Sequence, residues 1–251
     1  MKKFLSRRNL ILGAGAISAG ISVYKMDKRF LIPPKVRGGL LGVADILTMA
    51  SQRLLMYGQP LAREYSPKDI VQDFPQWGEV FPRDGTYQKH LREGFANWRL
   101  PIKGLVYQPR SFSLKELMNM PKRSQITMHV CEAGWSAIAE WTGVTLQDLL
   151  LAAGGVTPEA RYVSLETFDG FYESFDFFDV VHPQTILAYG MNGKNLPVGN
   201  GAPVRLRVER QCGYKQLKYI KSITVVSTMS NIGKGTGGTN SDENFHWYGG
   251  A

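Results

Sequence analysis

Cys131 has the clearest chemical potential in this 251-residue chain. It follows a β-type run, residues 125–130, and begins a turn-like stretch, residues 132–136. A thiolate at a strand end can point into a pocket, and sulfur is a donor for soft or high-valent metals. Two other fates are open. The thiol can be buried and inert, or it can form a disulfide with Cys212, the second of two cysteines.

A second segment, residues 200–221, is rich in groups that bind anions. A Gly-containing turn after Asn200 leads to Arg205, whose guanidinium can hold a phosphate through two parallel hydrogen bonds. Backbone N–H groups and lysines in residues 213–221 could bind an anion as well. The alternative is a solvated basic loop without a ligand. Taken singly, neither segment identifies a function.

Together, the two segments resemble the sulfite-oxidase-like molybdopterin-dependent oxidoreductases. Residues 128–136 (MHVCEAGWS) resemble the metal-cysteine segment of that family. Residues 196–206 (LPVGNGAPVRL) and 213–220 (GYKQLKYI) resemble its pterin-binding segment, and residues 189–193 (YGMNG) also look like the family. The resemblance extends over residues 79–226 and depends on both main motifs together.

The resemblance implies that Cys131 binds molybdenum, which also takes the two dithiolene sulfurs of a single pyranopterin and oxo groups. It implies that the pterin and its phosphate are held, partly by backbone groups, by Asn200, Arg205, Lys215, Gln216, Leu217 and Lys218. Thr167 matches a further polar cofactor contact. Residues 81–86 resemble an early cofactor loop that would add Arg83 and Asp84, although the family often has an asparagine where Asp84 stands.

The implied fold is mixed α+β, mainly β, of the sulfite-oxidase type. Because the chain ends at Ala251, we expect it to lack the C-terminal immunoglobulin-like dimerisation domain of animal and plant sulfite oxidases. In this it is closer to the small exported members, such as the periplasmic methionine-sulfoxide reductase catalytic subunits. Gly134 adds one residue to their cysteine motif between Ala133 and Trp135, so the resemblance does not carry over that specific activity.

The implied enzyme transfers an oxygen atom, with two electrons, on a small sulfur-containing substrate such as sulfite or an S-oxide. No C-x-x-C-H haem motif occurs, so we expect an electron partner, either a cytochrome c or a haem-bearing membrane subunit. His129, His182 and Arg207 could assist, but a hydrogen-bonded loop role is commoner for such residues. A rival function is a cofactor-free exported anion-binding module. A metal-independent hydrolase lacks support because no G-x-S-x-G motif occurs.

Hydrophobic periodicity indicates the elements that must position these residues. Residues 31–66 include a helical pattern, and residues 67–86 are rich in turns, which is typical of a binding loop. A capping box at residues 113–116 and a pattern at 143–153 predict short helices, and Asn192-Gly193 predicts a tight turn. Strand-like runs occur at residues 98–106, 125–130, 162–168, 186–190, 203–208 and 219–226. Residues 203–208 alternate apolar and basic side chains, which favours a half-exposed strand.

The first thirty residues have the pattern of an export signal. Ser6-Arg7-Arg8 precedes an apolar run, residues 10–23, that is short for a membrane span. It resembles a signal for the twin-arginine export machinery, which carries folded proteins. An ordinary secretory signal is the alternative. We expect residues 1–30 to be a signal or retained anchor, residues 31–78 an extension, residues 79–251 the molybdopterin domain, and the protein to be periplasmic.

The net charge of +9 is compatible with nucleic acid, a membrane surface or an anionic ligand as partner. The sequence shows no zinc-finger spacing, helix-turn-helix signal or RNA-recognition motif, so we expect no nucleic-acid binding. A small anionic or polar substrate and an acidic electron partner remain compatible with the charge.

Overall fold

A computed structural model describes residues 39–250. The chain divides into two compact units, Met1–Pro60 and Leu61–Ala251. In the first unit the described part contains helix α2 (Gly39–Leu55), as the periodicity predicts. The predicted signal lies outside the described residues. No helix within residues 39–250 has both the length and the apolar character needed to cross a membrane.

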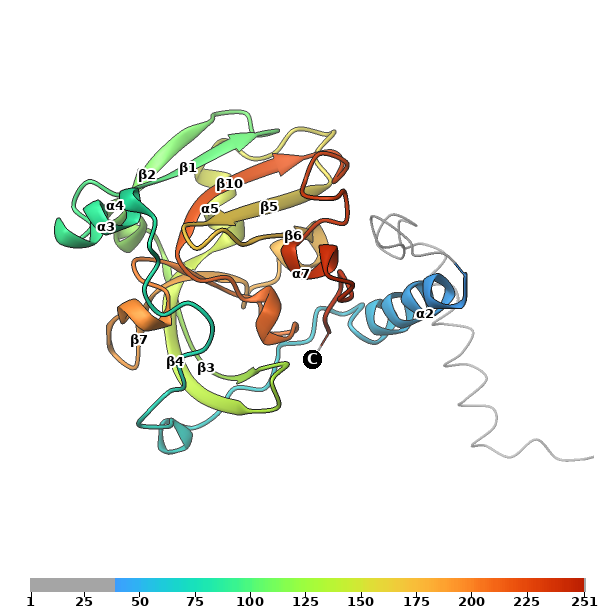
Figure 1. The fold of residues 1–251 in the computed structure, drawn as a ribbon, viewed down its shortest axis with the longest axis horizontal. Helices are drawn as coiled ribbons and strands as arrows, with labels where there is room; N and C mark the ends of the chain where they lie inside the picture. Colours follow the sequence, from blue (N-terminus) through green and yellow to red (C-terminus); the bar gives the residue numbers. More distant parts are fainter. Residues whose placement is uncertain (1–38, 251) are drawn as a thin grey trace, which may run out of the picture. The chain divides into compact units, whose positions relative to one another are not determined.

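The second unit contains two five-stranded sheets (Figure 1). The first has the order β2-β1-β10-β5-β6 and comprises β1 (Arg99–Gly104), β2 (Arg110–Ser113), β5 (Tyr162–Thr167), β6 (Tyr172–Asp176) and β10 (Ile220–Val226). The second has the order β3-β4-β7-β8, with β9 also paired to β7, and comprises β3 (Lys122–Val130), β4 (Ser136–Thr145), β7 (Ile186–Met191), β8 (Lys194–Asn195) and β9 (Arg205–Arg207). Only the β1–β10 pair is parallel among these pairings.

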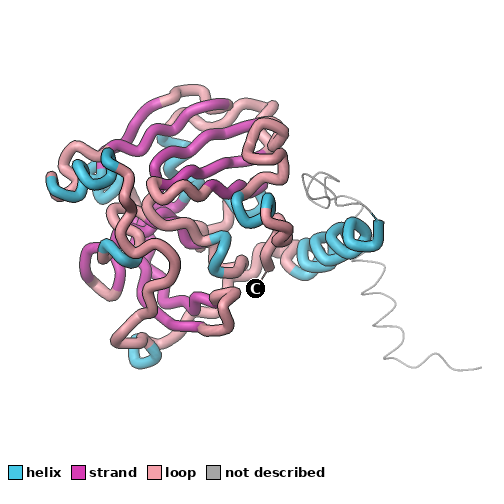
Figure 2. Tube along the Cα trace, in the orientation of Figure 1, coloured by secondary structure: helices cyan, strands magenta, loops and turns pink. Residues whose placement is uncertain are grey.

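The helices of this unit are short and connect or flank the strands (Figure 2). They are α3 (Gly85–Arg92), α4 (Leu114–Asn119), α5 (Leu146–Ala152), α6 (Phe177–Val180) and α7 (Thr239–Asp242), with the 3₁₀ turns η2 (Pro67–Asp69), η3 (Val198–Asn200) and η4 (Gly213–Lys215). The predicted mixed, mainly β fold is therefore confirmed for the described residues.

One large apolar core joins the two sheets. Leu100 and Ile102 of β1, Leu165 of β5 and Ile223 of β10 meet Leu206 of the second sheet in a single buried cluster. Burial of this apolar surface is the main favourable contribution to folding. The core therefore holds β9 through Leu206, and β3 is held by pairing along its whole length with β4, whose Val144 belongs to the same core.

Two details of the predicted elements are wrong. The helix predicted over residues 143–153 begins only at Leu146, because residues 143–145 still belong to β4, and Thr145 caps the helix by accepting a hydrogen bond from the N–H of Asp148 at 3.0 Å. Residues 205–207 form a fully buried strand, not a half-exposed one. The arginines at its ends are buried because they face a pocket and a carboxylate, as described next.

Candidate active site

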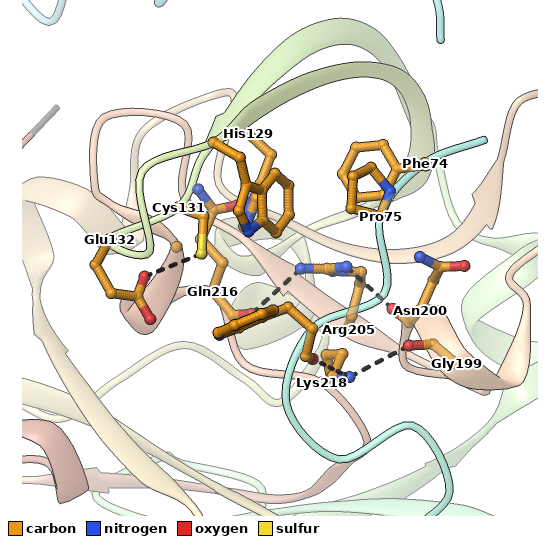
Figure 3. Close-up of a pocket in the computed structure, with 13 residues that line it drawn as sticks. Phe74, Pro75, His129, Cys131, Glu132, Gly199, Asn200, Arg205, Gln216 and Lys218 are labelled. Atoms are coloured by element: carbon orange, nitrogen blue, oxygen red, sulfur yellow. Dashed lines mark hydrogen bonds between the residues drawn. The ribbon is translucent and has the colours of Figure 1, made fainter. Parts of the chain in front are cut away.

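A hollow of about 90 Å³ opens where the end of β3 meets the segments before and after β9 (Figure 3). It is lined by Phe74, Pro75, Trp77, His129, Cys131, Glu132, Trp135, Gly199, Asn200, Arg205, Gly213, Gln216 and Lys218. The two motif segments of the sequence therefore meet in space, together with part of the irregular stretch 67–86.

Cys131 is the first residue after β3 and is 5% exposed. Its backbone N–H donates to the carbonyl of Trp135 at 2.9 Å, and its own carbonyl accepts from Gly134 at 3.1 Å. Gly134 has a φ of +89°, a conformation that glycine adopts without strain, so the inserted residue closes this turn. The thiol lies 3.6 Å from a carboxylate oxygen of Glu132. Burial, and to a lesser extent that carboxylate, raise the pKa of the Cys131 thiol. Both cysteines are free thiols, so the alternative disulfide with Cys212 is absent.

Arg205 is a buried cation, 4% exposed, and also lines the hollow. Its guanidinium donates to the carbonyls of Asn200 at 3.0 Å and Gln216 at 3.3 Å, and lies 4.8 Å from the ring centroid of Trp141. Its buried Nε has no hydrogen-bond partner within the described chain. Burial, followed by the charge of Arg207, lowers the pKa of Arg205 to about 9. A buried cation bonded to carbonyls and not to a carboxylate favours binding of an anion.

Lys218 joins two loops at the edge of the hollow. Its ammonium donates to the carbonyls of Trp77 at 2.8 Å, Glu79 at 2.5 Å and Gly199 at 3.2 Å. The hydroxyl of Tyr219 adds a bond to the carbonyl of Glu79 at 3.0 Å. Burial, and next the charge of Arg205, lower the pKa of Lys218 to about 8. Lys218 thus holds the 77–79 loop against the site and adds positive charge to it.

The side chain of Lys215 lies elsewhere, although its residue belongs to the same segment. It is fully buried, with its ammonium 2.5 Å from a carboxylate oxygen of Glu173 and 3.2 Å from the carbonyl of Ser174. The ammonium also lies 4.8 Å from the ring centroid of Phe175 and 5.5 Å from that of Trp247. Lys215 therefore anchors the segment to β6 and the C-terminal residues, and its charge is already paired.

A second hollow of about 220 Å³ continues from the first. The two share Trp77, Glu132, Gly213, Gln216 and Lys218. Leu217, another residue of the predicted set, lines the second hollow along with Asp169 and Phe171. The shared lining makes the two hollows one recess, with the thiol of Cys131 at one end.

The structure does not bring three other predicted residues to this recess. Thr167 is buried, and its hydroxyl bonds to Asp169 and, at 2.9 Å, to backbone groups of Phe171. Arg83 is exposed. Asp84 caps α3 by accepting a hydrogen bond from the N–H of Tyr87 at 2.9 Å. In this structure Thr167 and Asp84 satisfy backbone groups of their own loops.

Of the two histidines that could assist catalysis, one lies outside the hollow and the other lines it. His182 is buried outside the hollow and accepts a hydrogen bond from the N–H of Gln184 at 3.2 Å, which is the loop role expected of it. His129 lines the hollow and lies 2.9 Å from Arg207. Burial, and then the charges of Arg207 and Arg205, lower the pKa of His129 to about 2.

Several lining residues were missed by sequence reasoning. Phe74, Pro75 and Trp77 come from the irregular stretch 67–86, whose turn-rich composition indicated a binding loop without indicating the contacting side chains. Glu132 and Trp135 lie within the cysteine motif, and their signal is proximity to Cys131 in sequence.

Comparison with known proteins identifies the family. Residues 88–232 match the model of the oxidoreductase molybdopterin-binding domain. An Azospira oryzae protein named as a protein-methionine-sulfoxide reductase subunit, YedZ1, is 36% identical over 191 residues, covering 74% of this chain and 70% of that protein. The protein-methionine-sulfoxide reductase catalytic subunit MsrP of Campylobacter jejuni is 27% identical over 222 residues, covering 80% and 73%.

A solved structure agrees with the fold. The sulfane dehydrogenase SoxCD from Paracoccus pantotrophus matches with a TM-score of 0.50 and 27% identity, over 53% of this chain and 39% of that one. The matched residues 88–232 include Cys131 and the whole 200–218 segment. The chain therefore belongs to the oxidoreductase molybdopterin-binding domain family and is an oxidoreductase of the sulfite-oxidase type.

Proposed function

We propose that this enzyme reduces S-oxides, with methionine sulfoxide as the model substrate, at a molybdenum–pyranopterin cofactor bound through Cys131. The observation that carries the proposal is the meeting of a buried thiol with a buried cation in one hollow. Both relatives are named as subunits of protein-methionine-sulfoxide reductases, which favours an S-oxide over sulfite.

The residues of the recess fit such a cofactor. Cys131 supplies the soft donor that molybdenum accepts. The unpartnered Nε of Arg205 can donate to a phosphate, together with backbone groups from Asn200 and residues 216–218. The charge of Lys218 adds electrostatic attraction for that phosphate. Gly213 allows the backbone to approach the recess closely, because a Cβ at that position would lie only 2.9 Å from Nε2 of His129. When bound, the cofactor supplies a metal centre that exchanges two electrons and an oxygen atom with sulfur.

The protein's own contribution is binding and electrostatics. Reduction of an S-oxide consumes two electrons and two protons and yields a thioether and water. Arg205 and Lys218 place positive charge beside the site, and Glu132, 3.6 Å from the thiol of Cys131, is an acid–base group close to the metal position. Aromatic side chains at the recess, Phe171 and Trp77, are 40% and 58% exposed and suit contact with a thioether side chain.

The physiological context is part of the proposal. The electrons would come from a partner, a haem-bearing membrane subunit or a cytochrome c, and the relatives' description as subunits is compatible with this. We also propose that residues 1–30 act as a twin-arginine signal or retained anchor and that the enzyme works in the periplasm, since Ser6-Arg7-Arg8 precedes an apolar run. A single pyranopterin without haem is the proposed cofactor content.

The test is turnover of purified protein from a cofactor-competent host. Reduced viologen would supply electrons to methionine sulfoxide, and an artificial oxidant would accept them from sulfite. We expect the first reaction to be the faster and Cys131→Ser to lose it. Faster oxidation of sulfite, or full activity in Cys131→Ser, would contradict the proposal. Protein without molybdenum that still binds phosphate would favour the rival, a cofactor-free anion-binding module.

A further inference from the structure

His129 is the last residue but one of β3 and lies two residues before Cys131. Its side chain is 6% exposed and lines the same hollow as the thiol (Figure 3). The imidazole packs against two aromatic rings, with centroid distances of 5.3 Å to Trp135 and 6.0 Å to Phe74. These contacts fix the plane of the ring, so its two nitrogens have defined directions.

Arg207 determines which nitrogen carries the proton. Its guanidinium lies 2.9 Å from Nδ1 of His129. A guanidinium can only donate hydrogen bonds, so Nδ1 must accept and the ring must be neutral with its hydrogen on Nε2. Arg207 is itself held by two bonds to Glu209, at 3.0 and 2.6 Å, and Glu209 accepts from Gln125 at 2.7 Å. This buried series of hydrogen bonds, on the Nδ1 side of the ring, fixes the tautomer of His129.

The other nitrogen faces the recess. A Cβ on Gly213 would lie 2.9 Å from Nε2 of His129 and 3.1 Å from a carboxylate oxygen of Glu132. Gly213 lines both hollows, and its lack of a side chain allows its backbone to lie close to Nε2 at the wall that the two hollows share. The amide of Gln216 and the cation of Arg205 also face the imidazole. Nε2–H is therefore a neutral hydrogen-bond donor beside the position of the thiol.

We propose that His129 determines specificity by donating a hydrogen bond from Nε2 to the S=O oxygen of the substrate. This inference rests on the proposed S-oxide reduction. The oxygen of an S-oxide is a strong acceptor, whereas the thioether product has lost it. A site with a fixed donor discriminates against a ligand that lacks the acceptor. His129 would thus favour substrate over product, with Arg207 as its positioning residue.

The first experiment reads the tautomer directly in holoenzyme labelled with ¹⁵N-histidine. The chain has four histidines, and His129→Gln assigns the relevant signal. We expect His129 to be neutral with its hydrogen on Nε2. A hydrogen on Nδ1, or a charged ring, would overturn the inference. This result does not depend on the substrate, so it separates the inference from the proposed function.

The second experiment compares two variants in holoenzyme with measured molybdenum content. His129→Phe keeps an aromatic ring but has no donor, whereas the side-chain amide of His129→Gln can replace Nε2–H. For His129→Phe we expect full molybdenum content, a fall of about tenfold in kcat/KM for methionine sulfoxide, and unchanged inhibition by the matching thioether. His129→Gln should recover most of the loss.

Three outcomes would overturn the specificity role. Loss of molybdenum in His129→Phe would mean that the donor holds the cofactor. Equal weakening of S-oxide and thioether binding would indicate a packing role only. An unchanged kcat/KM in His129→Phe would show that the donor does not contact the substrate. If the wild-type protein failed to reduce any S-oxide while the tautomer was as expected, the proposed function would fail and the tautomer assignment would stand.

Discussion

Lys215 and Lys218 lie three residues apart in one cofactor-binding segment and have opposite environments. Lys215 is fully buried in an ion pair with Glu173. Lys218 lines the recess and bonds only to backbone carbonyls of facing loops. The difference shows that one positive charge is already neutralised by the protein, whereas the other is available to an anionic ligand. Lys215 therefore stabilises the segment, whereas Lys218 contributes positive charge to the site.

The largest expected effect is a loss of stability when Lys215 is replaced. Lys215→Met leaves the carboxylate of Glu173 buried without its cation, which costs about 3–5 kcal/mol of unfolding free energy. Urea unfolding of the cofactor-free protein measures this. The double variant Lys215→Met with Glu173→Leu should recover much of the loss, because an apolar pair can replace a buried ion pair. A Lys215→Met protein of wild-type stability that fails to retain cofactor would reverse the assigned roles.

Replacing Arg205 should affect cofactor binding more than stability, which is the opposite of the effect expected for Lys215. Arg205→Met removes a buried charge, and the gain from no longer burying it should offset the loss of its bonds to the carbonyls of Asn200 and Gln216. We therefore expect the unfolding free energy of the cofactor-free protein to change by less than about 1 kcal/mol. Cofactor binding should weaken by about 1–3 kcal/mol, the contribution of a charged hydrogen bond. Metal and pterin content of the purified variant test this, and an unchanged content would remove Arg205 from the site.

The charge of Lys218 in the recess can be tested through the pH dependence of phosphate binding and of stability. Its pKa is lowered to about 8 by burial and by Arg205, so above that pH the folded protein loses the charge before the unfolded chain does. Binding of inorganic phosphate to cofactor-free protein should therefore weaken, by about tenfold, as the pH rises from about 7 to about 10. Over the same window the lysine's contribution to stability rises with pH, because the unfolded chain binds more protons. Lys218→Met should abolish the part of each trend that is centred near pH 8 and leave the part due to Arg205 near pH 9. Persistence of the part near pH 8 would contradict the assignment.

The smallest effect is expected at the early loop. Asp84→Ala removes the N-cap of α3 and should cost about 1 kcal/mol of unfolding free energy. Molybdenum content should stay at the wild-type level, since Asp84 bonds to Tyr87 and does not line the recess. A loss of molybdenum in this variant would show that the early loop, residues 81–86, does contact the cofactor.

Local patterns predicted six of the ten described strands and the helices α2, α4 and α5, and tertiary contacts account for part of the rest. The Asn192-Gly193 turn has φ values of 50° and 72°, as a tight β7–β8 hairpin requires. Strand β4 was missed, in part because its Gly143 reads as a turn residue. There a Cβ would lie 2.1 Å from the carbonyl oxygen of Leu187, so glycine permits close strand pairing. Residues 205–207 appeared half-exposed because alternation does not reveal the buried pairing of Arg207 with Glu209.

The sequence could predict which segments form the site, but not where the side chains of those segments point. The motifs around Cys131 and Arg205 meet in the recess as expected. Sequence resemblance did not reveal that Lys215 faces Glu173 or that Thr167 closes its own turn with Phe171. These orientations depend on residues far away in the chain, which no local motif contains.

The most direct test of the central claim is the amount of molybdenum and oxidised pterin per chain in wild-type protein and Cys131→Ser, both made in a cofactor-competent host. We predict about one molybdenum and one pyranopterin per wild-type chain. Cys131→Ser should lose the metal or hold it without turnover, because a hard oxygen donor replaces sulfur. Wild-type protein without molybdenum, or a Cys131→Ser protein with full metal content and full activity, would contradict the account.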